Sequence, residues 1–179
     1  MVRSLAIVGT GLIGASIGLA AKRAGVERVS GFDVDADAGG RAAERGAIDA
    51  AAPTLEDAVA AAELAVVAAP VAALPGQIAA VLGASRECTV TDVGSTKGSV
   101  VAAVANAERF IGGHPICGSE AHGPEHARAE LFDGATWFLT PLAATDPGRY
   151  RAVHGFVASL GAVPVAVDPE AHDRLLALV

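Results

Sequence analysis

Cysteine is nearly absent from this chain of 179 residues, which contains only Cys88 and Cys117. Two cysteines are too few for the disulfide framework of a small secreted domain, and their separation does not match the C-x-x-C spacing of zinc or redox sites. The composition therefore favours a reducing cytoplasm, and no metal site is expected.

Positive charge is also scarce, because 13 Lys and Arg stand against 20 Asp and Glu, for a formal net charge of -7. This balance argues against partners that are held by nonspecific electrostatics, namely nucleic acid and anionic membranes. An anionic ligand would have to be held locally, by backbone amides or a few placed side chains.

Long hydrophobic runs are missing, although 52% of the residues are hydrophobic. The apolar segment 64–69 ends at Pro70, well short of the roughly 20 residues that a membrane-spanning helix needs. We therefore expect no transmembrane helix, and a core that one compact domain can bury.

Short β-branched runs alternate with glycine or polar breaks and with stretches rich in Ala and Leu, which is typical of βα units. Strands are expected at 5–8, 28–32, 63–68, 88–93, 110–113, 136–140 and 163–167. Helices are expected at 12–23, 35–44, 55–61, 72–82, 97–105, 125–131, 149–160 and 169–179. The pattern predicts an α/β fold of the Rossmann type, a doubly wound and mostly parallel sheet with helices on both faces.

A glycine-rich turn joins the first expected strand to the first expected helix, and it reads Gly9-Thr10-Gly11-Leu12-Ile13-Gly14. In a dinucleotide-binding turn of this spacing, the first glycine permits the tight turn, the second leaves room for the pyrophosphate and the third allows close helix packing. Amides at the start of the helix then hold the anion. The alternative is a glycine turn kept for packing alone.

Asp33 supports the binding interpretation, because it follows the turn by roughly 20 residues and ends the second expected strand. Its carboxylate is expected to accept hydrogen bonds from the adenosine ribose hydroxyls. Since an acid there repels a 2′-phosphate, NAD is favoured over NADP, although Arg41 could reach the same area. Ala69, Pro70 and Val71 follow another strand, and they either line the cofactor cleft or form a plain turn.

The segment from Asp92 to Lys97 ends a further strand and combines a glycine turn, a hydroxyl and a cation. Ser95 would either act in the site or cap the following helix, and the two roles can coexist.

His114 is the expected catalytic residue, because Gly112 and Gly113 bring the backbone close and Pro115 stiffens the exit from the strand. Hydride transfer from an alcohol carbon needs a base or an acceptor on the hydroxyl, and neutral histidine serves that role near pH 7. The alternative is a structural histidine. That structural interpretation is given to His122, His126, His154 and His172, and Cys117 is interpreted as a packing residue.

Three segments together resemble prephenate dehydrogenase and its arogenate-using relatives. They are the glycine turn extended to Gly18, the segment Asp92 to Lys97, and the segment from Gly112 through His114 and Cys117 to Glu120. The resemblance implies NAD-dependent oxidative decarboxylation of a small cyclohexadienol, prephenate to 4-hydroxyphenylpyruvate, in tyrosine biosynthesis.

By this resemblance His114 would bond the ring hydroxyl and accept its proton, Ser95 would align histidine and nicotinamide, and Glu120 would lie at the active-site entrance. Family members continue into an all-helical domain that forms a homodimer. We therefore expect residues 1–167 to be the NAD(P)-binding catalytic domain, and 168–179 to begin a helix leading to a dimerisation domain absent from this sequence.

Two alternatives stay open. A close variant would act on 4-amino-4-deoxyprephenate in a secondary pathway. A protein of another class would be a non-catalytic dinucleotide-binding module that joins a partner through its apolar C-terminal stretch.

Overall fold

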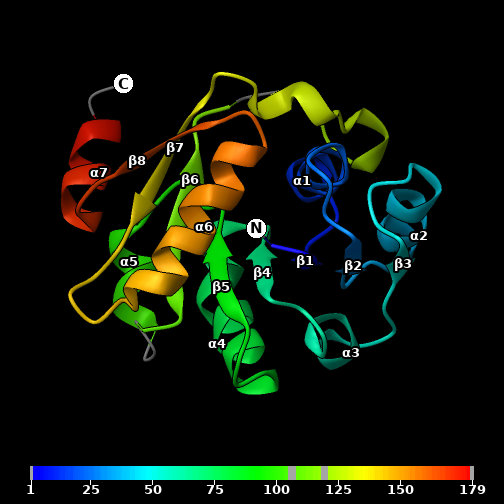
Figure 1. Ribbon diagram of the computed structural model, residues 1–179, viewed down its shortest axis with the longest axis horizontal. Helices are drawn as coiled ribbons and strands as arrows, with labels where there is room; N and C mark the ends of the chain where they lie inside the picture. Colours follow the sequence, from blue (N-terminus) through cyan, green and yellow to red (C-terminus); the bar gives the residue numbers. More distant parts are fainter. Residues whose placement is uncertain (1, 105–107, 118–120, 178–179) are drawn as a thin grey trace.

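The computed structural model describes residues 2–104, 108–117 and 121–177, and within them the chain forms one eight-stranded sheet (Figure 1). The strand order is β3-β2-β1-β4-β5-β6-β7-β8. Strands β1 to β6 are parallel, whereas β7 runs antiparallel to β6 and parallel to β8. The prediction of a doubly wound, mostly parallel α/β fold is therefore confirmed.

The strands of this sheet are short. They are β1 (Ser4–Val8), β2 (Arg28–Phe32), β3 (Ala50–Ala51), β4 (Leu64–Val67), β5 (Thr89–Asp92), β6 (Phe110–Pro115), β7 (Thr136–Thr140) and β8 (Val163–Ala166). The α-helices are α1 (Leu12–Arg23), α2 (Ala36–Glu44), α3 (Leu55–Val59), α4 (Leu74–Ala84), α5 (Gly98–Ala103), α6 (Pro147–Ser159) and α7 (Pro169–Leu176). Short 3-10 turns lie at η1 (Val71–Ala73), η2 (Pro124–His126) and η3 (Ala129–Phe132).

The sheet has a hydrophobic layer on each face, as the side-chain alternation of its strands requires. In β1, Leu5 and Ile7 belong to the core under α1, α2 and α6. Ala6 and Val8 belong to the opposite core, under α3, α4 and α5. Figure 1 shows these helices on the two sides of the sheet, so both faces are buried.

One expected helix, 125–131, is wrong. The chain there forms η2 and η3, which are separated by extended backbone at Ala127 and Arg128. The extended residues bond to other elements, since Arg128 N donates to Ser16 Oγ at 3.1 Å and Arg45 donates to the Ala127 carbonyl at 2.9 Å. Contacts with neighbouring helices therefore outweigh local helix propensity here.

The strand that carries His114 is longer than expected. We expected it to end at Gly113 and to deliver His114 to a loop, but β6 continues through Pro115 and His114 pairs with Phe138 of β7. The antiparallel partner strand satisfies the backbone there. His114 is consequently held on a strand of the sheet. The two-residue strand β3 was not expected, because its sequence has no strand pattern of its own.

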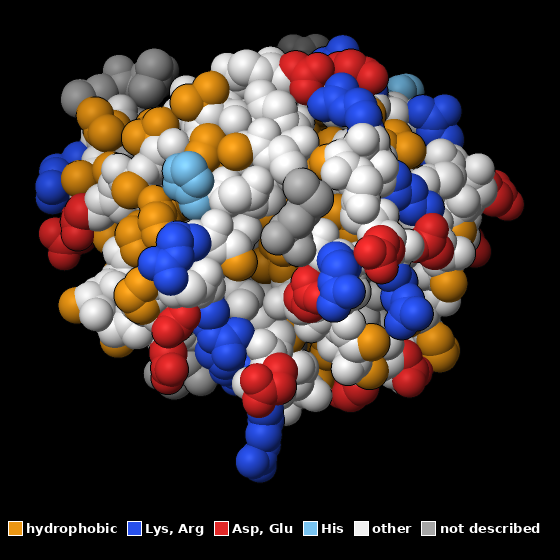
Figure 2. Space-filling view, in the orientation of Figure 1, with side chains coloured by type: hydrophobic (Ala, Val, Ile, Leu, Met, Phe, Trp, Pro, Cys, Tyr) orange, Lys and Arg blue, Asp and Glu red, His pale blue; other side chains and the backbone are white. Residues whose placement is uncertain are grey.

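Exposed hydrophobic side chains gather where β8 and α7 lie, at the side of the molecule opposite α2 (Figure 2). They include Val163, Val165 and Leu175, which are 52%, 38% and 51% exposed. Within the described residues, every helix is too short or too polar to cross a membrane.

Close packing of α1 gives a test of this architecture. A Cβ at the buried Gly18 would lie 2.1 Å from the Ala47 carbonyl oxygen, whereas one at the exposed Gly155 of α6 would meet nothing within 4 Å. Gly18→Ala should therefore lower the free energy of unfolding by about 1–3 kcal/mol through overpacking. Gly155→Ala should raise it by up to about 1 kcal/mol, because alanine favours helix. Urea denaturation measures both, and equal effects would contradict the packing described.

Candidate active site

The glycine-rich turn lies at the carboxyl end of β1 and leads into α1. Gly9 has a φ of +96°, which favours glycine, and a Cβ on Gly14 would lie 1.9 Å from the Gly9 carbonyl oxygen. A Cβ on Gly11 would meet no atom within 4 Å, so that side of the turn is open. No side chain of the cap residue covers the first turn of α1. The turn therefore offers open backbone at a helix start, which suits a pyrophosphate.

Asp33 is bonded to this turn. Its Oδ2 accepts from Thr10 N at 2.6 Å and from Thr10 Oγ at 3.0 Å, and its Oδ1 accepts from Asp35 N at 3.0 Å. Arg41 lies near, but it faces the carboxylates of Asp35 at 3.9 Å and Glu125 at 3.8 Å. The local charge is therefore dominated by acids, which is unfavourable for a 2′-phosphate.

Two cavities adjoin the turn and share four lining residues, Gly11, Ala68, Ala69 and Pro70. The first, of about 410 Å³, is lined by Gly9 and Asp33. The second, of about 490 Å³, continues along Leu12, Ile13, Val71, Gly94, Ser95, Cys117 and His122. Because they share a wall, we describe them as one cleft along the carboxyl ends of β1, β4 and β5, where doubly wound sheets bind ligands.

Most residues expected to bind the cofactor line this cleft. Thr10 and Gly14 line neither cavity: Thr10 is buried beneath the turn and bonds Asp33, and Gly14 packs against Gly9. Their contribution is to the shape of the turn.

Ser95 is an exposed residue in the wall of the second cavity. It does not cap the following helix, because α5 begins at Gly98 with Lys97 in the cap position. Instead, the carboxylate of Asp173 in α7 accepts from Lys97 N and Gly98 N, both at 2.8 Å. Of the two roles that the sequence left open for Ser95, capping is therefore wrong.

Beneath this turn lies a buried ion pair between Asp92 and Lys97, whose side chains are 0% exposed. The Asp92 carboxylate also accepts from Gly94 N at 2.8 Å and from Gly113 N at 3.0 Å. Lys97 Nζ also donates to the Gly113 carbonyl at 2.8 Å. Burial raises the pKa of Asp92 and lowers that of Lys97, and each charge opposes the shift of the other. The ion pair therefore links Gly94 in the cavity wall to Gly113, the residue that precedes His114.

The imidazole of His114 is half-buried at the end of β6. Burial is the main cause that lowers its pKa to about 4; Lys97, and His172 when it is protonated, lower it further, while Asp173 opposes the shift. His114 is thus neutral near pH 7 and can accept a hydrogen bond. Its Nδ1 lies 3.0 Å from Nε2 of His172, and no other hydrogen bond to its ring is formed by the described residues.

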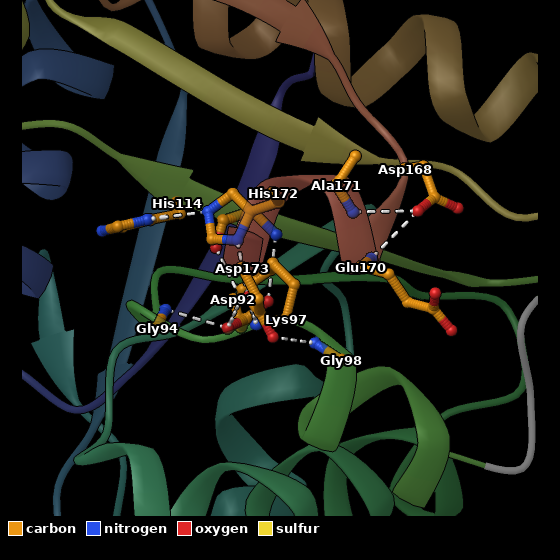
Figure 3. Close-up of polar contacts among 11 residues, drawn as sticks. Asp92, Gly94, Lys97, Gly98, His114, Asp168, Glu170, Ala171, His172 and Asp173 are labelled. Carbon is orange, nitrogen blue, oxygen red and sulfur yellow. Dashed lines mark hydrogen bonds and ion pairs between the residues drawn. The ribbon is translucent and has the colours of Figure 1, made fainter. Parts of the chain in front are cut away.

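His172 is fully buried between this ring and its own neighbour in α7, Asp173 (Figure 3). Its Nδ1 lies 2.8 Å from Oδ1 of Asp173. Partial burial alone would raise the pKa of Asp173, but hydrogen bonds from the Lys97 amide, the His172 ring and the Gly98 amide lower it below its ordinary value. The carboxylate is therefore ionised near neutral pH.

Sequence reasoning interpreted His172 as one structural histidine among several, whereas the structure places it against His114. The adjacent His-Asp pair at 172 and 173 was the available signal. Cys117 lines the second cavity, and burial raises the pKa of its thiol, so it is not a ready nucleophile. Glu120, expected at the entrance, lies outside the described residues.

Comparison with known proteins agrees with this geometry. The family described as prephenate dehydrogenase, nucleotide-binding domain, matches residues 17–166. A probable prephenate dehydrogenase from Streptomyces niveus is 36% identical, over 98% of this chain and 48% of the relative. Prephenate dehydrogenase from Bacillus subtilis (strain 168) is 31% identical, over 98% of this chain and 49% of the relative. The chain thus spans about half the length of these curated relatives.

Solved structures show the same likeness. Prephenate dehydrogenase from Aquifex aeolicus superimposes with a TM-score of 0.90 at 30% identity, over 96% of this chain and 64% of that one. A complex of prephenate dehydrogenase from A. aeolicus with hydroxyphenyl propionate and NAD+ superimposes with a TM-score of 0.88 at 31% identity, over 97% of this chain and 63% of that one. The chain therefore belongs to the prephenate dehydrogenase family and carries its nucleotide-binding domain.

Proposed function

We propose that this chain binds NAD and carries the catalytic histidine of a prephenate or arogenate dehydrogenase. The reaction is the oxidative decarboxylation of a cyclohexadienol, prephenate to 4-hydroxyphenylpyruvate, in tyrosine biosynthesis. One observation carries the proposal: the Asp92 carboxylate bonds both Gly94 in the cleft wall and Gly113 beside His114. A neutral imidazole is thereby fixed next to a cleft of dinucleotide type.

The cleft residues fit NAD. The open side of Gly11 and the start of α1 would hold the pyrophosphate, and Asp33 would accept from the adenosine ribose hydroxyls. Ala69, Pro70 and Val71 would line the opposite wall. When bound, NAD supplies the hydride acceptor.

His114 then acts on the substrate. Its neutral ring would accept a hydrogen bond from the ring hydroxyl and take up the hydroxyl proton as hydride leaves the same carbon. Loss of the substrate carboxylate as CO2 makes the ring aromatic. Ser95, on the cleft wall, would help align His114 and the nicotinamide. Glu120 stays a prediction for the substrate entrance.

We further propose that the complete protein is a homodimer formed through a helical domain that this sequence does not include, to which the segment from residue 168 leads. The exposed apolar side chains of β8 and α7 support a covering partner on that side (Figure 2). The half of the relatives' length outside the match also supports it. The proposed setting is the reducing cytoplasm, since Cys88 and Cys117 are free thiols.

Asp33→Asn tests the cofactor assignment. Removing the carboxylate charge removes repulsion of a 2′-phosphate, so affinity for NADP relative to NAD should rise roughly tenfold. Calorimetric titration with both dinucleotides measures this ratio. Asp37→Asn removes the same charge from the exposed start of α2 and should leave the ratio unchanged. Tighter binding of NADP by the unmodified chain would overturn the assignment.

His114→Asn tests the catalytic assignment. In the complete protein, this substitution should lower the rate of prephenate-dependent NADH formation roughly a hundredfold or more and leave the affinity for NAD near normal. His154→Asn, on the exposed side of α6, is the matched control and should leave turnover unchanged. Cofactor binding without any prephenate or arogenate turnover in the unmodified protein would instead favour a non-catalytic module.

The charge state of His114 can be measured directly. Because burial lowers its pKa to about 4 from the ordinary 6.5, the ring should stay neutral as the pH falls from about 7.5 to about 5. Nuclear magnetic resonance titration of the histidine rings, assigned with His114→Asn, follows this. A midpoint near 6.5 for His114 would show that the ring is not desolvated as described.

A further inference from the structure

We propose that His172 and Asp173 are positioning residues that hold His114 in the tautomer with its proton on Nδ1 and its lone pair on Nε2. The use of that lone pair on a substrate hydroxyl rests on the proposed function. The hydrogen-bond chain itself depends only on the contacts among these three residues (Figure 3).

The chain of bonds starts at the carboxylate. Asp173 accepts from Lys97 N and Gly98 N, both at 2.8 Å, which anchors it to the turn that carries Ser95. An ionised carboxylate has no proton to give, so in its 2.8 Å contact with His172 the proton must lie on Nδ1 of the ring. The direction of this hydrogen bond is therefore fixed, with His172 as the donor and Asp173 as the acceptor.

The donor role of His172 Nδ1 in turn determines which ring nitrogen of His114 carries its proton. A neutral imidazole has one N–H, and with Nδ1 of His172 donating, its Nε2 is left as an acceptor. The 3.0 Å contact to His114 then needs a donor, which is the Nδ1–H of His114. Nε2 of the neutral His114 must carry the lone pair, and no described residue bonds it.

Packing fixes the orientation of the rings. His172 is 0% exposed and lies edge-on to His114, with centroids 5.2 Å apart and planes at 68°. Phe138, the cross-strand partner of His114, also contacts the His172 ring, with centroids 5.4 Å apart and planes at 83°. In Figure 3 the second nitrogen of His114 points away from His172. The acceptor atom therefore has both a fixed tautomer and a fixed direction.

The arrangement has a consequence for proton uptake. When the hydroxyl proton reaches Nε2, the O–H bond breaks, an N–H bond forms and His114 becomes an imidazolium. His172 lies between this charge and the Asp173 carboxylate, which favours the charged ring electrostatically. This offsets part of the desolvation that lowers the pKa of His114.

The first test is the tautomer in the unmodified chain, read from the two ring-nitrogen signals of His114 near neutral pH after 15N labelling of histidine. We expect a protonated Nδ1 and an unprotonated Nε2, the opposite of the preference of histidine in water. A proton on Nε2 of His114 would overturn the proposal. A doubly protonated His172 would produce this result, because its Nε2–H would donate to Nδ1 of His114 and leave the His114 proton on Nε2.

The second test separates positioning from packing. His172→Phe keeps an aromatic ring against Phe138 but removes both hydrogen bonds, so the Nδ1–H tautomer of His114 should be lost. Turnover should fall roughly tenfold or more, with KM for NAD unchanged. In His172→Gln, the amide oxygen can accept from Nδ1 of His114, so this variant should restore part of the Nδ1–H tautomer and part of the turnover. His154→Gln is the exposed control.

Thermal unfolding and NAD titration of each variant show whether it is folded, and the result for the unmodified chain decides the proposal even if His172→Phe does not fold. An unchanged tautomer in folded His172→Phe would overturn it. The expected tautomer without prephenate or arogenate turnover would refute the proposed function alone. Full turnover with the proton on Nε2 would refute the positioning role alone.

Discussion

The buried ion pair of Asp92 and Lys97 is the constraint on which the site depends. Taking two charges out of water costs several kcal/mol per ion, and mutual attraction offsets this only when further hydrogen bonds are made. Both groups make them, to the amides of Gly94 and Gly113 and to the Gly113 carbonyl. An apolar pair of similar volume could fill the space but could not bond this backbone.

The contacts of the pair explain why distant segments meet at one place. Asp92 ends β5 and Gly113 lies in β6, so the pair fixes the end of one strand against its neighbour. The backbone of Lys97 and Gly98 then binds Asp173, which brings α7 and His172 to the same edge. The cleft wall, His114 and the last helix are thereby parts of one hydrogen-bonded unit.

The two halves of the site use different chemistry. The half proposed to hold the cofactor is made of backbone, because a glycine turn and a helix start offer amides that could hold an anion without any charged side chain, which suits a chain of net charge -7. The other half is made of side chains whose protonation is controlled by burial and by fixed partners. A neutral acceptor at His114 requires that control, because an exposed histidine would be partly charged near its ordinary pKa.

Local patterns were sufficient to predict the sheet and the glycine turn between its first strand and helix, because strand alternation, turn spacing and helix periodicity depend on residues close together in the chain. They also made Asp33 and His114 candidates for the site. They were not sufficient for the extended backbone at Ala127 and Arg128, the pairing of His114 in β6 with β7, or the contact of His172 with His114. Those features join residues far apart in the chain, such as positions 58 residues apart in the histidine pair, and their energies appear only after the chain is folded. The sequence by itself determined which residue types are available for the chemistry. Only the tertiary structure decided which of them meet, because folding buries Asp92, Lys97 and His172 near one another. Folding also leaves one ring nitrogen of His114 without a protein partner among the described residues.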